Sequence, residues 1–127
     1  MSLQPVPIQN VPGVPDYTCT AFLPKSSDYC LLIPVINEGS RILTELGRAQ
    51  KAGVDRLVDI VICDGGSTDG SMNPDTLELY GVNTLLVKTG PGKQGAQLRM
   101  GLHFALTFGY KGVLTIDGNN KDSIEDV

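Results

Sequence analysis

Four short apolar runs, each followed by a polar loop, constrain the fold more than any other feature of this sequence. They occupy residues 29–33, 57–63, 82–87 and 112–116. Nearly continuous apolar runs of this length, separated by segments with helical periodicity, are typical of parallel strands that are covered on both faces. The sequence therefore predicts an α/β fold, a three-layer sandwich with a mainly parallel sheet, and places all the polar loops at one edge of that sheet.

Helices are predicted between these strands, at about residues 40–52, 75–80 and 96–108, and one more begins at residue 124. In the helix at 96–108, one apolar stripe is expected to face the sheet. Its members, which recur every three or four positions, are Leu98, Leu102, Ala105 and Leu106.

Residues 1–28 differ from the rest of the chain because they hold five of the eight prolines and show little hydrophobic periodicity. Such a segment is predicted to be an extended arm on the body of the domain or to be disordered. The sequence thus divides into a proline-rich arm, residues 1–28, and a domain of residues 29–127.

The composition of the chain makes some classes of binding partner improbable. The 127 residues suffice for one domain, and the net charge of -4 disfavours nucleic acid and anionic membranes as general partners. The three cysteines have no CxxC spacing and are interpreted as reduced core thiols, which favours a cytoplasmic location. No apolar run approaches the roughly 20 residues of a membrane span, so any attachment to the inner membrane face is expected through parts outside this sequence.

The loop that follows the second apolar run is the strongest candidate for a binding site. It reads DGGSTDG at residues 64–70, where glycines permit close approach of a ligand to the backbone. An ionised Asp64 only accepts hydrogen bonds, so it suits a base N–H or ribose hydroxyls. Asp69 is as well explained by helix capping as by ligand binding. The alternative for the whole loop is a tight strand-to-helix turn.

Three further loops are expected at the same edge. Glu38 can accept hydrogen bonds from a ligand or favour the dipole of the following helix. Lys93 and Arg99, near a helix N-terminus, suit a diphosphate, and the alternative is that both are solvated surface charges. Asp117 can hold a divalent metal or form a turn. His103, within a helix, is interpreted as a packing or surface residue.

Taken together, three motifs closely resemble those of family 2 glycosyltransferases, including the dolichyl-phosphate mannosyltransferase type. They are IPVINE at residues 33–38, DGGSTDG at 64–70 and GKQGAQLRMG at 92–101. The resemblance covers residues 29–127. It implies the GT-A (Rossmann-like) fold, whose N-terminal half binds a nucleotide-diphosphate sugar, usually with Mg or Mn, and inverts the anomeric centre during transfer.

The resemblance also implies roles for particular residues. Pro34, Asn37 and Glu38 match the first nucleotide-binding loop, Asp64 matches the base-contacting acid, and Lys93 and Arg99 match the diphosphate side. Asp69 is included among the nucleotide-binding residues, and Asp117 and Asn119 are assigned to the metal. The chain departs from the family here, because the usual Asp-x-Asp motif reads Asp117-Gly118-Asn119, or Thr115-Ile116-Asp117 if the register shifts by two, and retains one carboxylate in either register.

The sequence therefore predicts the donor-binding half of a glycosyltransferase that transfers a sugar to an unidentified hydroxyl or polyprenyl phosphate. No residue is assigned as the catalytic base, because the family's acceptor site lies beyond the matching segment, and the fragment alone is expected to be inactive. Two alternatives are a nucleotide-binding module without catalysis and a sugar nucleotidyltransferase. The base, the sugar and the oligomeric state stay open.

Overall fold

The computed structural model describes residues 4–91, 95–121 and 123–127. Its elements follow one another along the chain in the order β1 (Val6–Ile8), β2 (Tyr17–Ala21), β3 (Tyr29–Val35), α1 (Ser40–Lys51), α2 (Val54–Leu57), β4 (Asp59–Asp64), α3 (Pro74–Leu79), β5 (Thr84–Lys88), α4 (Gly95–Thr107), β6 (Gly112–Thr115) and the 3₁₀ helix η1 (Ile124–Asp126). The predicted alternation of strands and helices is therefore present from β3 onwards.

The strands form one mixed, mostly parallel sheet of six, in the order β1-β2-β5-β4-β3-β6. β3 pairs in parallel with both β4 and β6, and β4 pairs in parallel with β5. β2 and β1 extend the sheet beyond β5 in antiparallel fashion. The α/β class and the mainly parallel sheet are thus confirmed.

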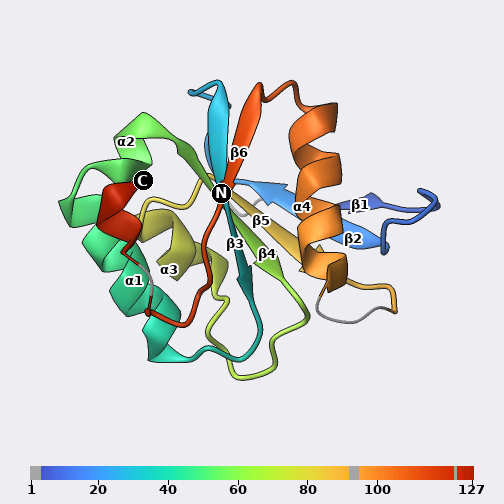
Figure 1. Cartoon of the computed structure of the whole chain (residues 1–127). Coiled ribbons are helices and arrows are strands. Elements are labelled where there is room, and N and C mark those ends of the chain that lie inside the picture. The colour runs from blue at the N-terminus through green and yellow to red at the C-terminus, as the bar shows by residue number, and fades with distance from the viewer. Residues whose placement is uncertain (1–3, 92–94, 122) are drawn as a thin grey trace.

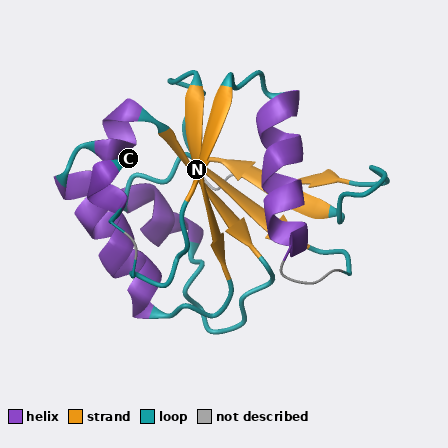
Figure 2. Ribbon diagram, viewed as in Figure 1, coloured by secondary structure: helices purple, strands orange, loops and turns teal. Residues whose placement is uncertain are grey.

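The helices lie on both faces of the sheet, which gives three layers (Figures 1 and 2). α1, α2 and α3 cover one face, and α4 crosses the other. Each face has its own apolar core. One core joins α1 and α3 to residues such as Leu31, Ile33 and Ile62, and the other joins α4 to Leu32, Val61 and Cys63. Alternate residues of β3 therefore point to opposite cores, as a strand covered on both sides requires.

The proline-rich segment contributes two strands that the sequence did not predict. Tyr17 and Cys19 are buried on the α4 side, and the whole of β2 pairs with β5. Pro12 and Pro15 lie in the turn between β1 and β2. Alternation over only five residues, next to several prolines, gives too weak a periodic signal to predict such a strand.

The predicted apolar stripe of α4 is wrong, because among its four members only Ala105 is buried. Leu102 and Leu106 are exposed at 43% and 80%. The helix instead buries a face on which small residues lie beside larger ones, namely Ala96, Gln97, Met100, Gly101, Phe104 and Ala105. A Cβ on Gly101 would lie 2.7 Å from Cys63 Sγ, so the small face allows α4 to approach the sheet closely. Both stripes satisfy helical spacing, and close packing decides between them.

All three cysteines are free and buried, as predicted for reduced core thiols. Burial, with a smaller contribution from the Asp59 charge, raises the pKa of Cys30 to about 11. In the part of the chain that the structure describes, no helix combines the length and apolar character needed to cross a membrane.

Candidate functional site

The strand order of the parallel part of the sheet reverses between β3 and β6. From β3 the chain proceeds to β4 and then β5 on one side, and it returns through α4 to β6 on the other side. In open α/β sheets, ligands bind outside the carboxyl ends of the strands at such a reversal. The loops after β3, β4 and β6 meet at this carboxyl edge, where the predicted site residues were expected.

Asp64, the last residue of β4, is 2% exposed and organises the loop that follows it. Its Oδ1 accepts hydrogen bonds from the backbone N–H groups of Gly66 at 3.2 Å and Ser67 at 3.0 Å, and from the Ser67 hydroxyl at 2.6 Å. None of the described residues donates to its Oδ2. The carboxylate therefore holds the loop through one oxygen and leaves its second oxygen as an acceptor.

Asn37 joins the loop after β3 to this loop. Its backbone N–H donates to Ser67 Oγ at 2.9 Å, and its Oδ1 accepts from the Thr68 N–H at 2.8 Å. Asn37 has a φ of 48°, a left-handed conformation that asparagine tolerates better than most residues. The predicted residues Asn37 and Asp64 are thus connected through a single serine.

Asp69 makes a second connection between the same two loops. Its Oδ2 accepts from the Gly39 N–H at 3.0 Å, and its Oδ1 accepts from the Ser71 N–H at 3.0 Å and the Ser71 hydroxyl at 2.5 Å. These bonds, first of all that from the Ser71 hydroxyl, lower the pKa of Asp69. Asp69 does not cap α3, whose N-cap is Asn73. The helix-capping alternative is therefore wrong.

Gln97 also contributes hydrogen bonds to this edge, a role that the sequence did not predict. It is 5% exposed on α4, and its Nε2 donates to the carbonyl oxygens of Val35 at 2.6 Å and Cys63 at 3.0 Å. The Val35 oxygen also accepts from the Gly65 N–H at 2.9 Å. One amide thus connects α4 to the ends of β3 and β4. A polar residue on the buried face of α4 would have indicated this role, had the face been assigned correctly.

Glu38 contacts Arg41 in the first turn of α1, the helix that follows it. Its carboxylate lies 3.1 Å from Arg41 Nε, and its backbone oxygen accepts from the Arg41 N–H and Nε. The side chain is 18% exposed in this pair. The spacing of three residues between opposite charges at the start of a helix is the sequence signal for such a contact.

The loop after β6 is joined to β3 at Pro34, whose carbonyl oxygen accepts from the Gly118 N–H at 3.3 Å. A Cβ on Gly118 would lie 2.5 Å from Val35 Cγ1, so this position requires glycine for close approach. Asp117 is exposed beside it. Asn119 Oδ1 accepts from the Lys121 N–H at 3.1 Å, which is a local turn contact.

The residues assigned to a metal supply only part of a set of metal ligands. Within residues 4–91, 95–121 and 123–127, no group of three or more His, Cys, Asp or Glu side chains is placed to hold a metal ion. Asp117 offers one carboxylate, and the amide oxygen of Asn119 is used in its turn. This arrangement suits a metal that takes most of its ligands from a bound diphosphate and water, as Mg²⁺ commonly does.

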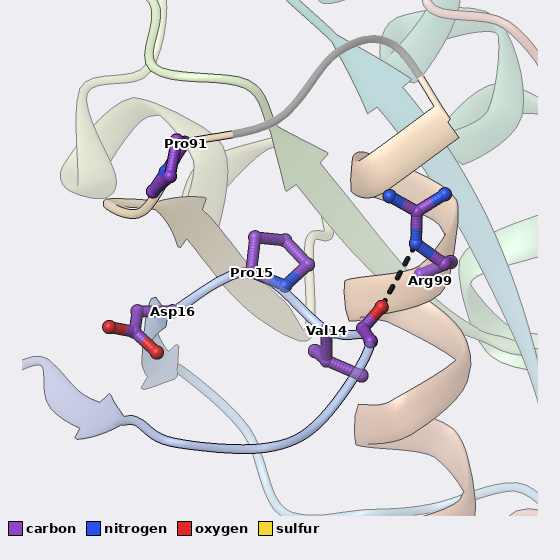
Figure 3. Close-up of a pocket in the computed structure, with 6 residues that line it drawn as sticks. Val14, Pro15, Asp16, Pro91 and Arg99 are labelled. Atoms are coloured by element: carbon purple, nitrogen blue, oxygen red, sulfur yellow. Dashed lines mark hydrogen bonds between the residues drawn. The ribbon is translucent and has the colours of Figure 1, made fainter.

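Arg99 lies on the exposed side of α4, toward the turn between β1 and β2. Its Nε donates to the Gly13 carbonyl oxygen at 3.0 Å, and it lines a pocket of about 320 Å³ with Gly13–Asp16 and Pro91 (Figure 3). Its Nη1 also lies 3.3 Å from where a Cβ on Gly95, the first residue of α4, would be. The guanidinium and the helix N-terminus are therefore close together. Lys93 falls outside the described residues.

His103 contacts Tyr17 rather than any residue of the carboxyl edge. The Tyr17 hydroxyl and His103 Nδ1 are 2.7 Å apart, and the two rings meet edge to face. Burial raises the pKa of Tyr17 to about 12. This is the packing role predicted for the histidine.

No model of a known protein family, no curated protein and no solved structure matches this chain.

Proposed function

We propose that the carboxyl edge of the sheet binds a nucleotide-diphosphate sugar, and that the chain forms the donor-binding half of an inverting, GT-A type glycosyltransferase. The observation that carries the proposal is the hydrogen-bonded network between the loops after β3 and β4, at the point where strand order reverses. Two of the three motifs that resemble family 2 glycosyltransferases, IPVINE and DGGSTDG, supply this network.

Each group has a distinct part in this proposal. The Oδ2 of Asp64 accepts a hydrogen bond from the base or the ribose, because its Oδ1 is already used by the loop. Asn37 and Asp69 hold the two loops together and fix the position of Asp64 relative to β3. Arg99, beside the N-terminus of α4, attracts the diphosphate, since guanidinium groups and helix N-termini both favour anions.

Asp117, with the diphosphate oxygens and water, would hold Mg or Mn. The ion would neutralise negative charge on the leaving diphosphate. Gly118 keeps Asp117 beside β3 through its bond to Pro34. Transfer with inversion also needs a base that activates the acceptor. We assign that base and the acceptor, a hydroxyl or a polyprenyl phosphate, to the part of the enzyme that completes this half.

Calorimetric titration with UDP and GDP, each with Mn²⁺, tests the proposal. Saturable binding of one nucleotide to the wild-type chain is expected, with at least tenfold weaker binding by Asp64→Asn. This substitution keeps the shape and removes the charge that favours a donor partner. Asp75→Asn, at an exposed position of α3, is the control and should bind like the wild type. The proposal would be refuted if neither nucleotide binds, or if the wild type, Asp64→Asn and Asp75→Asn bind the nucleotide with equal affinity.

A nucleotide-binding module without catalysis is the second candidate. It is favoured by the single carboxylate at Asp117 and by the turn contact that uses Asn119 Oδ1. Both candidates predict nucleotide binding, and they differ in metal dependence. If Mn²⁺ strengthens binding of the nucleoside diphosphate and Asp117→Asn abolishes that effect, the transferase is supported. Metal-independent binding supports the module.

A further inference from the structure

A second pocket lies at the opposite, amino edge of the sheet. It has a volume of about 200 Å³ and lies where the C-terminal part of α4 passes the ends of β2 and β5. Figure 1 shows that this end of α4 points away from the loops after β3 and β4. The residues of its wall that matter here are Cys19, Leu23, Lys25, Phe104, Phe108 and Tyr110.

Aromatic rings form much of this wall. Phe104 lies with its ring centroid 4.7 Å from that of Phe108 and 6.0 Å from that of Tyr110. Phe104 is buried at 4% exposure, whereas Phe108 and Leu23 are exposed at 51% and 49%. Large apolar side chains exposed around a pocket are typical of a binding site. The pocket therefore offers a ring-sized apolar surface that is open to solvent.

The polar atoms around this surface are already bonded within the protein. The Tyr110 hydroxyl donates to Asp59 Oδ2 at 2.6 Å. Asn83 Nδ2 donates to the Pro24 carbonyl oxygen at 3.1 Å, and Asn83 Oδ1 accepts from the Thr84 hydroxyl at 2.7 Å. The interior wall thus recognises an apolar group, and the charged group at the rim determines the polar part of the ligand.

That charged group is the ammonium of Lys25. It lies 5.1 Å from the centre of the Tyr110 ring and 3.7 Å from Asp28 Oδ1. Asp28 Oδ2 is also 3.6 Å from the ammonium of Lys111. Two cations thus share one carboxylate, which is 54% exposed. Such exposed pairs are weak, so the Lys25 ammonium can exchange Asp28 for the carboxylate of a ligand.

We propose that this pocket binds a small monocarboxylic acid whose apolar part is about the size of one aromatic ring. The ring packs against Phe104 and Phe108, and the carboxylate pairs with Lys25. The volume of about 200 Å³ is smaller than that of typical drug-sized sites, which limits the ligand to this size. The site is separate from the carboxyl edge and does not depend on nucleotide binding.

A ligand series on the wild-type chain tests the proposal by amide NMR titration. Phenylacetate, the neutral 2-phenylethanol and the cationic phenethylamine share one ring and differ in charge. Phenylacetate should shift the amides of Leu23, Phe108 and Tyr110 in a saturable manner. It should bind about threefold to fivefold more tightly than the alcohol, the upper part of the range for one partly exposed ion pair, and the amine should bind most weakly.

Two surface substitutions assign the contacts. Lys25→Gln should remove the preference for the acid over the alcohol, and Phe108→Ala should weaken both at least threefold. Lys51→Gln, at an exposed position on α1, is the matched control and should change neither. No saturable binding of phenylacetate, equal binding of the acid and the alcohol, or an unchanged preference in Lys25→Gln would each overturn the proposal.

Discussion

Substitution of Gln97 by methionine should destabilise the fold, because the amide of Gln97 connects α4 to the ends of two strands. Methionine has a similar length and is tolerated in apolar cores, so the change removes the hydrogen bonds while it largely keeps the volume. The lost contacts are those from Nε2 to the carbonyl oxygens of Val35 at 2.6 Å and Cys63 at 3.0 Å. The Val35 oxygen keeps the Gly65 N–H as a partner.

The magnitude follows from these two bonds. A neutral hydrogen bond contributes about 1 kcal/mol net, so loss of both should lower the free energy of unfolding by about 2 kcal/mol. For a domain of this size, that corresponds to a decrease in Tm of roughly 8 °C. Because the connected carbonyls lie at the starts of the loops that contain Asn37 and Asp64, the same substitution should also weaken nucleotide binding.

Urea unfolding followed by circular dichroism measures the effect. Gln50→Met is the matched control, because Gln50 is exposed on α1 and its Nε2 makes one bond, to the Leu79 carbonyl oxygen at 2.9 Å. We expect this control to cost about 0.5 kcal/mol or less. If Gln97→Met stays within about 0.5 kcal/mol of the wild type, or costs no more than Gln50→Met, the role assigned to Gln97 is refuted.

Three further predictions concern packing and pH. Gly118→Ala should lower the free energy of unfolding in urea by about 1–3 kcal/mol, because its Cβ would meet buried Val35. Gly47→Ala, within α1, should raise it by up to about 1 kcal/mol, because its Cβ would be in ordinary contact with Tyr80. Equal effects of the two substitutions would contradict the packing of Gly118 against Val35. The pKa of Tyr17 is raised from 10.0 to about 12, so its contribution to stability is complete below pH 10 and is lost as pH rises toward 12. Tyr17→Phe should therefore flatten the dependence of the free energy of unfolding on pH between these values. Parallel pH dependences for the wild type and the variant would exclude this contribution of Tyr17. The pKa of Asp69 is lowered, so its contribution to stability is present above its ordinary pKa of 3.8 and is lost as pH falls through the lower pKa of the folded state. An NMR titration of the Asp69 carboxyl group should therefore give a midpoint below 3.8. A midpoint at or above 3.8 would argue against the hydrogen bonds assigned to Asp69 between the two loops.

Much of the fold could be predicted because strands covered on both faces give continuous apolar runs. β3 and β4 were predicted within about two residues of their ends for this reason. β1 and β2 were missed because they are short and close to prolines. The buried face of α4 was assigned wrongly because leucines are the stronger apolar signal, whereas close contact with the sheet favours small residues such as Gly101.

The candidate site was predictable in part. Polar residues directly after adjacent parallel strands must meet at one edge, and this brought Asn37, Asp64 and Asp69 into one network. The partners of Glu38 and Arg99 depend on side-chain direction and on the unpredicted turn near Gly13, so strand order alone did not give them.

Mapping of amide chemical shifts on the isotopically labelled chain during titration with UDP and GDP, each with Mn²⁺, tests the central claim most directly. If the carboxyl edge is the donor site, one nucleotide should shift the amides of residues 36–39, 64–71 and 117–120 together, with a single dissociation constant. The amides around Phe108 should not move with them. Absence of saturable shifts for either nucleotide, or shifts confined to residues outside these three loops, would contradict the account.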